Sequence, residues 1–359
     1  MVRNILVGLS LLLACRYSYA QTSTCAQTLR LVRSTYELGR FHEIPGLLEK
    51  CLQRGEGNFT KQEKVEALKI LTLAYLYSED PEQADQAMLE LLKTDHFFEI
   101  NENVDPAEFT ALYRTFRTKP LFAIGLKFGA NASLPVGLRN FYVGAEGGGV
   151  GEYSIGYNIQ YGASFEKALF TGLKDTIRWT IAPELIFSSH QFSQSNERYT
   201  VSDETGESFS RGEYIHSLSR INLNALLQYR FSTSSVVNPY IMAGGAISAV
   251  TKAQLQADTQ FPEVGSVETG ASIDFTDSYN TFDYAAIVGA GVKYKFGEIY
   301  LSADVRYQYG LSNVIDGAAR FNPEAAMDRG YVPNDHTLSN LVVNIGFVWP
   351  YFKPRKLLK

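Results

Sequence analysis

The feature that most constrains this chain is an alternation of apolar and polar side chains that recurs from residue 121 to residue 349. The clearest stretch is 153–165, YSIGYNIQYGASF, in which every odd position is apolar or aromatic. A period of two places successive side chains on opposite faces of a β-strand. Strands of about a dozen residues with aromatic ends suit a tilted bilayer crossing better than a soluble sandwich, whose strands average about five or six residues.

The alternation predicts an all-β transmembrane barrel of eight antiparallel strands. We expect these strands at 121–132, 153–165, 176–188, 219–231, 239–250, 284–296, 299–311 and 338–351. The links after the odd-numbered strands are long and those after the even-numbered ones are short, down to the two-residue Gly297-Glu298 turn. Outer-membrane barrels have short periplasmic turns and long extracellular loops. An even strand count then predicts that both termini are periplasmic.

Whole-chain properties agree with a barrel in the outer membrane and its lipid. The mean hydropathy of −0.12 argues against a helical membrane protein, whereas inward polar side chains dilute the hydropathy of barrel strands. The net charge of −5 offers no basic face, so we expect no nucleic-acid partner. The five histidines lack metal-ligand spacing, and no Gly-rich phosphate loop or nucleophile elbow occurs, so the sequence predicts no cofactor and no metal.

The first 20 residues are typical of a secretory signal peptide. Arg3 precedes an apolar run at 5–14, which is too short to span a membrane as a helix. Small residues then predict cleavage between Ala20 and Gln21. The alternative is a lipobox that ends at Cys15, with lipidation of that cysteine.

Residues 21–118 predict a small all-α domain of helical hairpins ahead of the barrel at 119–352 and a basic tail at 353–359. Apolar residues there recur at three- and four-residue steps, as on the buried face of a helix. Gly39 and Asp80-Pro81 mark the breaks, and a further helix is expected at 106–116. The two hairpins loosely resemble tetratricopeptide repeats. Such a domain either binds a periplasmic partner or is a helical cap that packs beneath the barrel.

After signal cleavage, Cys25 and Cys51 are the two remaining cysteines. An exported protein meets an oxidising compartment, which favours a disulfide between them across the first helical hairpin. The alternative is a pair of buried free thiols.

Several charged residues occupy positions that should face the interior of the barrel. They are Arg178, Glu184, Arg220, Arg230, Lys293, Asp304 and Arg306. An eight-stranded barrel is just wide enough for side chains to fill it. We therefore expect these charges to pair inside a plugged barrel rather than to line a wide diffusion channel.

Two further patterns are weak candidates for chemistry. His190 and Ser193 lie near the outer end of the third strand, where a Ser/His lipid hydrolase site is one interpretation and chance proximity the other. Carboxylates cluster between the fifth and sixth strands, where a solvated loop is the expected structure and a divalent-cation or partner site the alternative. They are Asp258, Glu263, Glu268, Asp274 and Asp277, against the single Lys252. The basic tail is expected in the periplasm, near anionic headgroups.

The barrel sequence resembles PorT-type outer-membrane barrels of Bacteroidetes. The resemblance lies in 296–313 (FGEIYLSADVRYQYGLSN), in Asn238-Pro-Tyr240 through Gly244-Gly245, and in Gly346-Phe347 to Lys353-Pro354. It covers roughly two thirds of the chain and implies an envelope setting that includes type IX secretion and gliding. The added helical domain departs from the bare barrel of this family.

Together these patterns predict a non-enzymatic outer-membrane barrel whose periplasmic helical domain binds an envelope partner in the periplasm or outer membrane, with type IX secretion machinery as one candidate. The alternative is a lipid-modifying barrel enzyme.

Overall fold

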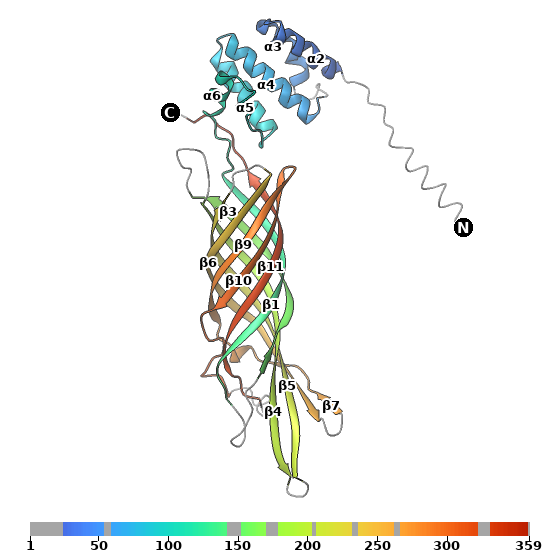
Figure 1. Cartoon of the computed structure of the whole chain (residues 1–359), viewed down its shortest axis with the longest axis vertical. Coiled ribbons are helices and arrows are strands. Elements are labelled where there is room, and N and C mark those ends of the chain that lie inside the picture. The colour runs from blue at the N-terminus through green and yellow to red at the C-terminus, as the bar shows by residue number, and fades with distance from the viewer. Residues whose placement is uncertain are drawn as a thin grey trace, which may run out of the picture. The chain divides into compact units, whose positions relative to one another are not determined.

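The computed structural model describes residues 24–53, 59–141, 152–169, 179–202, 206–231, 236–261, 266–321 and 331–357. The chain forms two compact units (Figure 1). A helical unit comprises Met1–Lys119 and Phe352–Lys359, and a barrel unit comprises Pro120–Tyr351. Cys15 and the predicted cleavage site at Ala20 and Gln21 lie outside the described residues.

The helical unit contains five described α-helices and one short 3-10 turn. They are α2 (Thr24–Glu37), η1 (Phe41–Glu43), α3 (Ile44–Leu52), α4 (Lys61–Tyr77), α5 (Pro81–Thr94) and α6 (Ala107–Tyr113). Local sequence sets two of the starts. Thr60 and Glu63 form a reciprocal capping box at α4, and Asp80 caps α5 ahead of Pro81 in its first turn. None of the described helices is both long and apolar enough to cross a membrane.

The core of the helical unit is formed by the apolar stripes that the sequence predicts. Leu29 and Val32 of α2 pack with Ile44 and Leu48 of α3 and with the buried faces of α4 and α5. Cys25 and Cys51 form the expected disulfide, with their Cα atoms 5.6 Å apart. The disulfide joins the start of α2 to the end of α3 and so closes the first hairpin.

The C-terminal tail is part of the helical unit. The Phe352 ring stacks on His96 at a centroid distance of 5.3 Å, and the Arg117 guanidinium donates to the Lys353 carbonyl at 2.7 Å. Lys356 forms an ion pair with Asp85 of α5. This basic residue is therefore engaged by a carboxylate of its own unit.

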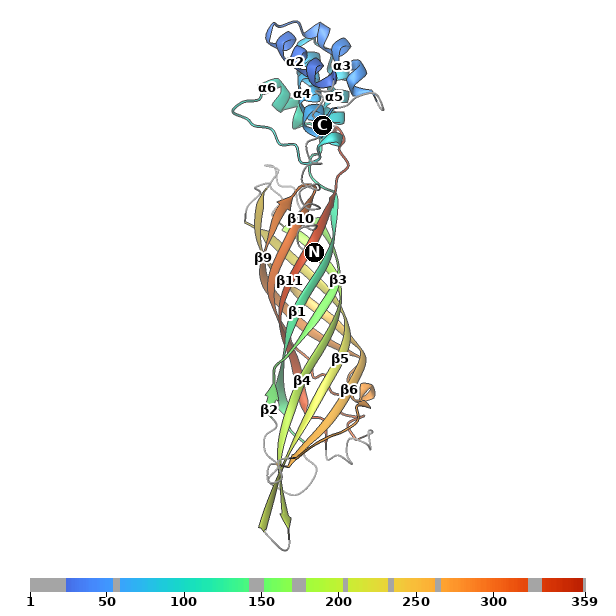
Figure 2. The same ribbon diagram turned by 90° about the vertical axis from the view of Figure 1, so that its right-hand side faces the viewer.

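Eight of the described strands form a closed antiparallel ring, as the sequence predicts (Figure 2). In chain order they are β1 (Phe122–Arg139), β3 (Gly156–Ala168), β4 (Trp179–Ser202), β5 (Gly206–Arg230), β6 (Val237–Phe261), β9 (Phe282–Phe296), β10 (Ile299–Gly310) and β11 (Asp335–Tyr351). Pairing of β1 with β11 closes the ring, because Phe122 lies opposite Tyr351. The short strands β2 (Glu152–Ser154), β7 (Ser266–Thr269) and β8 (Ile273–Asp274) extend the long-loop end, on β4 and β6.

Three strands are much longer than the alternation predicts. β4, β5 and β6 contain 24, 25 and 25 residues, so most of the expected loop at 189–218 is a β-hairpin instead. The error has a physical cause. Beyond the bilayer both faces of a strand can be polar, as in Ser193-Gln194-Ser195, so the alternation of polarity disappears while the backbone pairing continues.

The outward face of the ring carries an apolar band. On β11 its exposed residues run at every second position from Leu341 to Tyr351, and on β9 they run from Phe282 to Phe296. Both stretches reach the length of about 9–11 residues that a tilted strand needs to cross the hydrocarbon core. The inward residues between them are mostly buried.

Removing the disulfide should destabilise the helical unit. A closed loop of this sequence separation, 26 residues, restricts the unfolded chain enough to contribute about 3 kcal/mol. We expect Cys25→Ser with Cys51→Ser to lower the free energy of unfolding of the helices by that amount, measured by urea titration of the full chain with helical circular dichroism. Reductant should reproduce the effect on the wild type and leave the double variant unchanged. Equal stability of both proteins would contradict the prediction.

Candidate functional site

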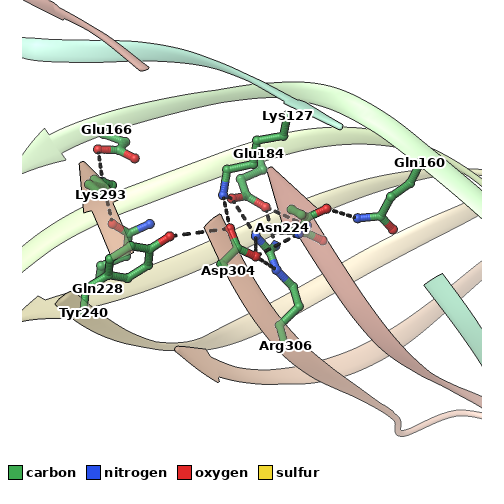
Figure 3. A network of polar contacts seen from close by, with 11 residues as sticks. Lys127, Gln160, Glu166, Glu184, Asn224, Gln228, Tyr240, Lys293, Asp304 and Arg306 are labelled. Atoms are coloured by element: carbon green, nitrogen blue, oxygen red, sulfur yellow. Dashed lines mark hydrogen bonds and ion pairs between the residues drawn. The ribbon is translucent and has the colours of Figure 1, made fainter. Parts of the chain in front are cut away.

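The barrel interior is centred on four charged side chains. Lys127 of β1 donates to Glu184 of β4 at 2.6 Å and to Asp304 of β10 at 3.0 Å. Arg306 of β10 donates to Glu184 at 2.6 Å and to Asp304 at 2.8 Å. Figure 3 shows how the two cations and the two carboxylates meet across the ring. All four side chains are at most 3% exposed, so water neither hydrates nor screens their charges.

Side-chain amides donate further hydrogen bonds to the carboxylate oxygens of this network. Asn224 donates to Glu184 at 3.2 Å, Asn344 donates to Asp304 at 2.8 Å, and Gln160 donates to the Asn344 carbonyl oxygen at 2.7 Å. A buried ion pair is favourable only when its other lone pairs and protons are also satisfied. The three amides meet this requirement here through these hydrogen bonds. Each of them comes from a further strand of the ring.

Two smaller ion pairs lie on either side of the central network. At the short-turn side, Lys293 donates to Glu166 at 2.5 Å and to Gln228 at 3.1 Å, and Arg230 lies 3.7 Å from Glu166. Glu166, Lys293, Gln228 and Tyr240 are seen together in Figure 3. At the long-loop side, Arg220 pairs with a buried carboxylate, Asp283.

The sequence analysis found part of this set. Glu184, Arg220, Lys293, Asp304 and Arg306 are buried inside the ring, whereas the Arg230 side chain is 28% exposed. Arg178 lies outside the described residues.

Sequence reasoning missed Lys127, Glu166 and Asp283. The signal was present for two of them. Lys127 stands between Leu126 and Phe128, and Glu166 follows Phe165, so the same alternation places both on the inward face.

A second buried cluster closes the interior at the long-loop end. Both ring nitrogens of His216 form hydrogen bonds. Nδ1 lies 2.9 Å from Tyr279 Oη, and Nε2 lies 2.8 Å from Tyr331 Oη. Its ring stacks on Phe192 at 4.9 Å, and His336 lies 6.5 Å from it between ring centroids. Loop residues such as Phe275, Val314 and Ile315 pack against these rings. We call this group the outer aromatic cluster.

His190 and Ser193 do not form a catalytic pair. Their odd spacing along β4 places them on opposite faces of the strand. His190 is buried in the interior, 3.0 Å from Ser133 Oγ and 2.8 Å from Ser188 Oγ, while Ser193 Oγ lies 2.6 Å from Ser154 Oγ at an exposed position. A hydrolase mechanism needs the base within hydrogen-bond distance of the nucleophile, and this pair lacks that geometry.

The acidic segment does not converge on a cation site in the part of the chain that is described. Glu263 lies outside that part, and Glu268 lies on β7. Asp274 accepts from the amide and hydroxyl of Thr276 at 2.9 and 2.7 Å. Among the described residues, no group of three or more His, Cys, Asp or Glu side chains is arranged to hold a metal ion.

Comparison with known proteins identifies the family. The model of the outer membrane protein beta-barrel domain matches residues 114–316, more than half of the 359 residues. The chain belongs to this outer-membrane barrel family. Family and fold together make it an outer-membrane β-barrel protein. Comparison with curated proteins finds no match.

Three solved structures similar to the chain include one that is described as an outer membrane protein, OprG. OprG from Pseudomonas aeruginosa is 13% identical, with 66% of this chain and 98% of OprG covered, at a TM-score of 0.36. Neisserial surface protein A is 14% identical, with 66% and 97% covered, at a TM-score of 0.27. Ail, the attachment invasion locus protein of Yersinia pestis, is 10% identical in its complex with the heparin analogue sucrose octasulfate, with 64% and 99% covered, at a TM-score of 0.24.

Breaking the central network should destabilise the barrel. Glu184→Gln leaves Lys127 and Arg306 with one carboxylate between them, so we expect a loss of about 3 kcal/mol or more in the free energy of unfolding. Urea titration in lipid vesicles, followed by the fluorescence of Trp179 and Trp349, would measure it. Glu213→Gln, the same change at a position that forms no buried ion pair with any described side chain, should cost no more than about 0.5 kcal/mol. Equal effects would contradict the network's role.

Low pH should open the outer aromatic cluster, which lies beyond the apolar band. Burial lowers the pKa of His216 to about 3 and that of His336 to about 4. An unfolded histidine has a pKa of about 6.5, so the open form binds more protons as the pH falls. The stabilisation is present above pH about 6.5 and should fall by about 2 kcal/mol per histidine at pH 5.

Hydrogen exchange of residues 310–321, measured between pH 7 and 4 after correction for intrinsic rates, would follow this opening. His216→Gln should reduce the pH dependence. A protection pattern that stays constant down to pH 4 would be incompatible with two buried neutral histidines.

Proposed function

We propose that this outer-membrane barrel anchors the helical unit in the periplasm, where the unit binds an envelope protein. The filled interior of the barrel is the observation that carries the proposal. The side chains of the central network and of the outer aromatic cluster are buried, and this burial favours a plugged interior over a solute path. A plugged barrel anchors the protein in the membrane and does not transport solutes. We therefore assign partner binding to the residues outside the bilayer.

The helical unit offers a groove for such a partner. A cavity of about 210 Å³ lies between α3, α4 and α5. Leu68, Leu71 and Ala87 form its apolar floor, and exposed Gln83 and Gln86 stand at its rim. Lys64 and Glu90 add one charge of each sign. Apolar floors with a few polar groups suit a protein segment that inserts an apolar side chain.

Chain connectivity supports a periplasmic location. Strand β1 begins and strand β11 ends at the same end of the ring, where Phe122 lies opposite Tyr351. The two-residue Gly297-Glu298 turn lies at this end, because it joins β9 to β10 there. Short turns of outer-membrane barrels face the periplasm, so both links to the helical unit should emerge on that side.

The resemblance to PorT-type barrels suggests the first partner to test. That family's setting includes type IX secretion, so we propose a periplasmic component of such machinery as the candidate. An enzymatic function is not proposed, because His190 and Ser193 lie on opposite faces of β4.

Site-specific photocrosslinking would test the binding groove. A crosslinking residue at Gln83 or Gln86 should capture one protein of the same mass in native outer membranes, whereas the exposed Arg30 of α2 serves as the control. Lys64→Glu should reduce the captured amount severalfold, since it reverses the groove's cation. Capture at Arg30 to the same extent, or no capture at either glutamine, would contradict the proposed surface.

The same strain background would test the sidedness. An epitope inserted after Glu99 should be accessible only in permeabilised cells, and one after Ala271 should be accessible on intact cells. The opposite pattern would place the helical unit outside and would remove the periplasmic proposal.

A further inference from the structure

The outward face of three neighbouring strands changes from apolar to polar at one level. Phe187, Ile221 and Ala249 lie side by side on β4, β5 and β6 as the last apolar row. The next row is Ser189, Ser219 and Lys252, and the row after it is Gln191, Ser217 and Gln254. A change this abrupt marks the boundary between hydrocarbon and headgroups on this side of the barrel.

A β-bulge turns Lys252 toward this boundary. The pairing of β5 with β6 shifts register between Ser219 and Arg220, so that Thr251 is an extra residue. The Thr251 hydroxyl donates to the Ser219 carbonyl at 2.9 Å. Without the extra residue Lys252 would share the inward face of Ser248, but with it Ala253 is buried and Lys252 is exposed. Bulges are a recognised means of re-aiming a side chain.

The two polar rows enclose a small cavity. It measures about 120 Å³ and is lined by Asn158, Ser189, His190, Gln191, Ser217, Leu218, Ser219, Lys252 and Gln254. Its outward-facing side chains are three hydroxyls, two amides and one ammonium group. The set therefore contains several hydrogen-bond donors and a single positive charge, with no carboxylate in the lining.

The charge of Lys252 is available to a ligand. In the described part of the chain, no carboxylate lies within ion-pair distance of its ammonium group. The carboxylate of Asp274 interacts electrostatically with Lys252. That carboxylate already accepts two hydrogen bonds from Thr276, which hold it in its own turn.

We propose that this cavity binds the phosphate of an outer-leaflet lipid headgroup, with Lys252 as the cation and the serine hydroxyls as additional donors. The proposal rests on the sidedness proposed above, which places the cavity at the outer leaflet. Phosphate is the anion that suits one ammonium group among hydroxyls, and a headgroup at the bilayer boundary presents it at this depth. A phosphorylated glycolipid supplies this chemistry in the outer leaflet.

The test uses the full chain in detergent micelles and measures lipid A binding by native mass spectrometry. One basic residue near a membrane surface contributes about 1 kcal/mol, so Lys252→Gln should weaken binding about fivefold and Lys252→Glu more. Lys167→Gln is the matched control. Lys167 is also exposed and outward-facing, but it lies toward the other end of the apolar band, on β3 near Trp179 of β4. The control should bind lipid A as the wild type does.

Each outcome separates the alternatives. Lipid A stripped of its phosphates should bind wild type and Lys252→Gln equally, which would identify phosphate as the group that Lys252 recognises. Equal weakening by Lys167→Gln would overturn the proposal, as would displacement of lipid A by millimolar inorganic phosphate alone. If the micelle result holds but the epitopes reveal the reverse sidedness, the phosphate site stands at the inner leaflet and the proposed function fails separately.

Discussion

The structure depends on one constraint, which is that no backbone amide or carbonyl can remain unpaired in hydrocarbon. Closing the sheet satisfies this constraint, and pairing of β1 with β11 completes the closure. Closure has a second effect, because it creates an interior too narrow for bulk water. Any charge placed there must find its counter-charge on another strand. Lys127, Glu184, Asp304 and Arg306 meet that demand, so strands far apart in the sequence become mutually dependent.

Pairing of this kind is weak evidence for stability by itself, since desolvation offsets much of the attraction. Its stronger effect is on register. A shift of one residue between two strands would move every inward side chain to the lipid face. For β10 such a shift would expose Asp304 and Arg306 to hydrocarbon, which carries a high free-energy cost. The polar interior therefore favours one alignment of the ring over its neighbours.

The strand count, the antiparallel order and the helical hairpins could be predicted from sequence, because each depends on local periodicity. The predicted strand ends were wrong where the alternation of apolar and polar residues stops. The strands β4 to β6 continue into water, where neither face needs to be apolar, and their full length was missed. The bulge at Thr251 moves Lys252 from the inward to the outward face of β6. Counting alternate residues along the strand does not reveal this change. The ion pairs require knowing which strands lie opposite one another, which no local pattern contains.

The attachment of the tail has a consequence for the order of assembly. Phe352 and Lys356 contact His96 and Asp85 of the helical unit, yet the ribosome adds them after every strand of the ring. They follow directly after β11, the strand that closes the ring against β1. The helical unit therefore acquires these contacts only after the last strand of the ring has been synthesised. A chain that stopped within the ring would lack both contacts, so its helical unit would differ from that of a chain with all eight strands.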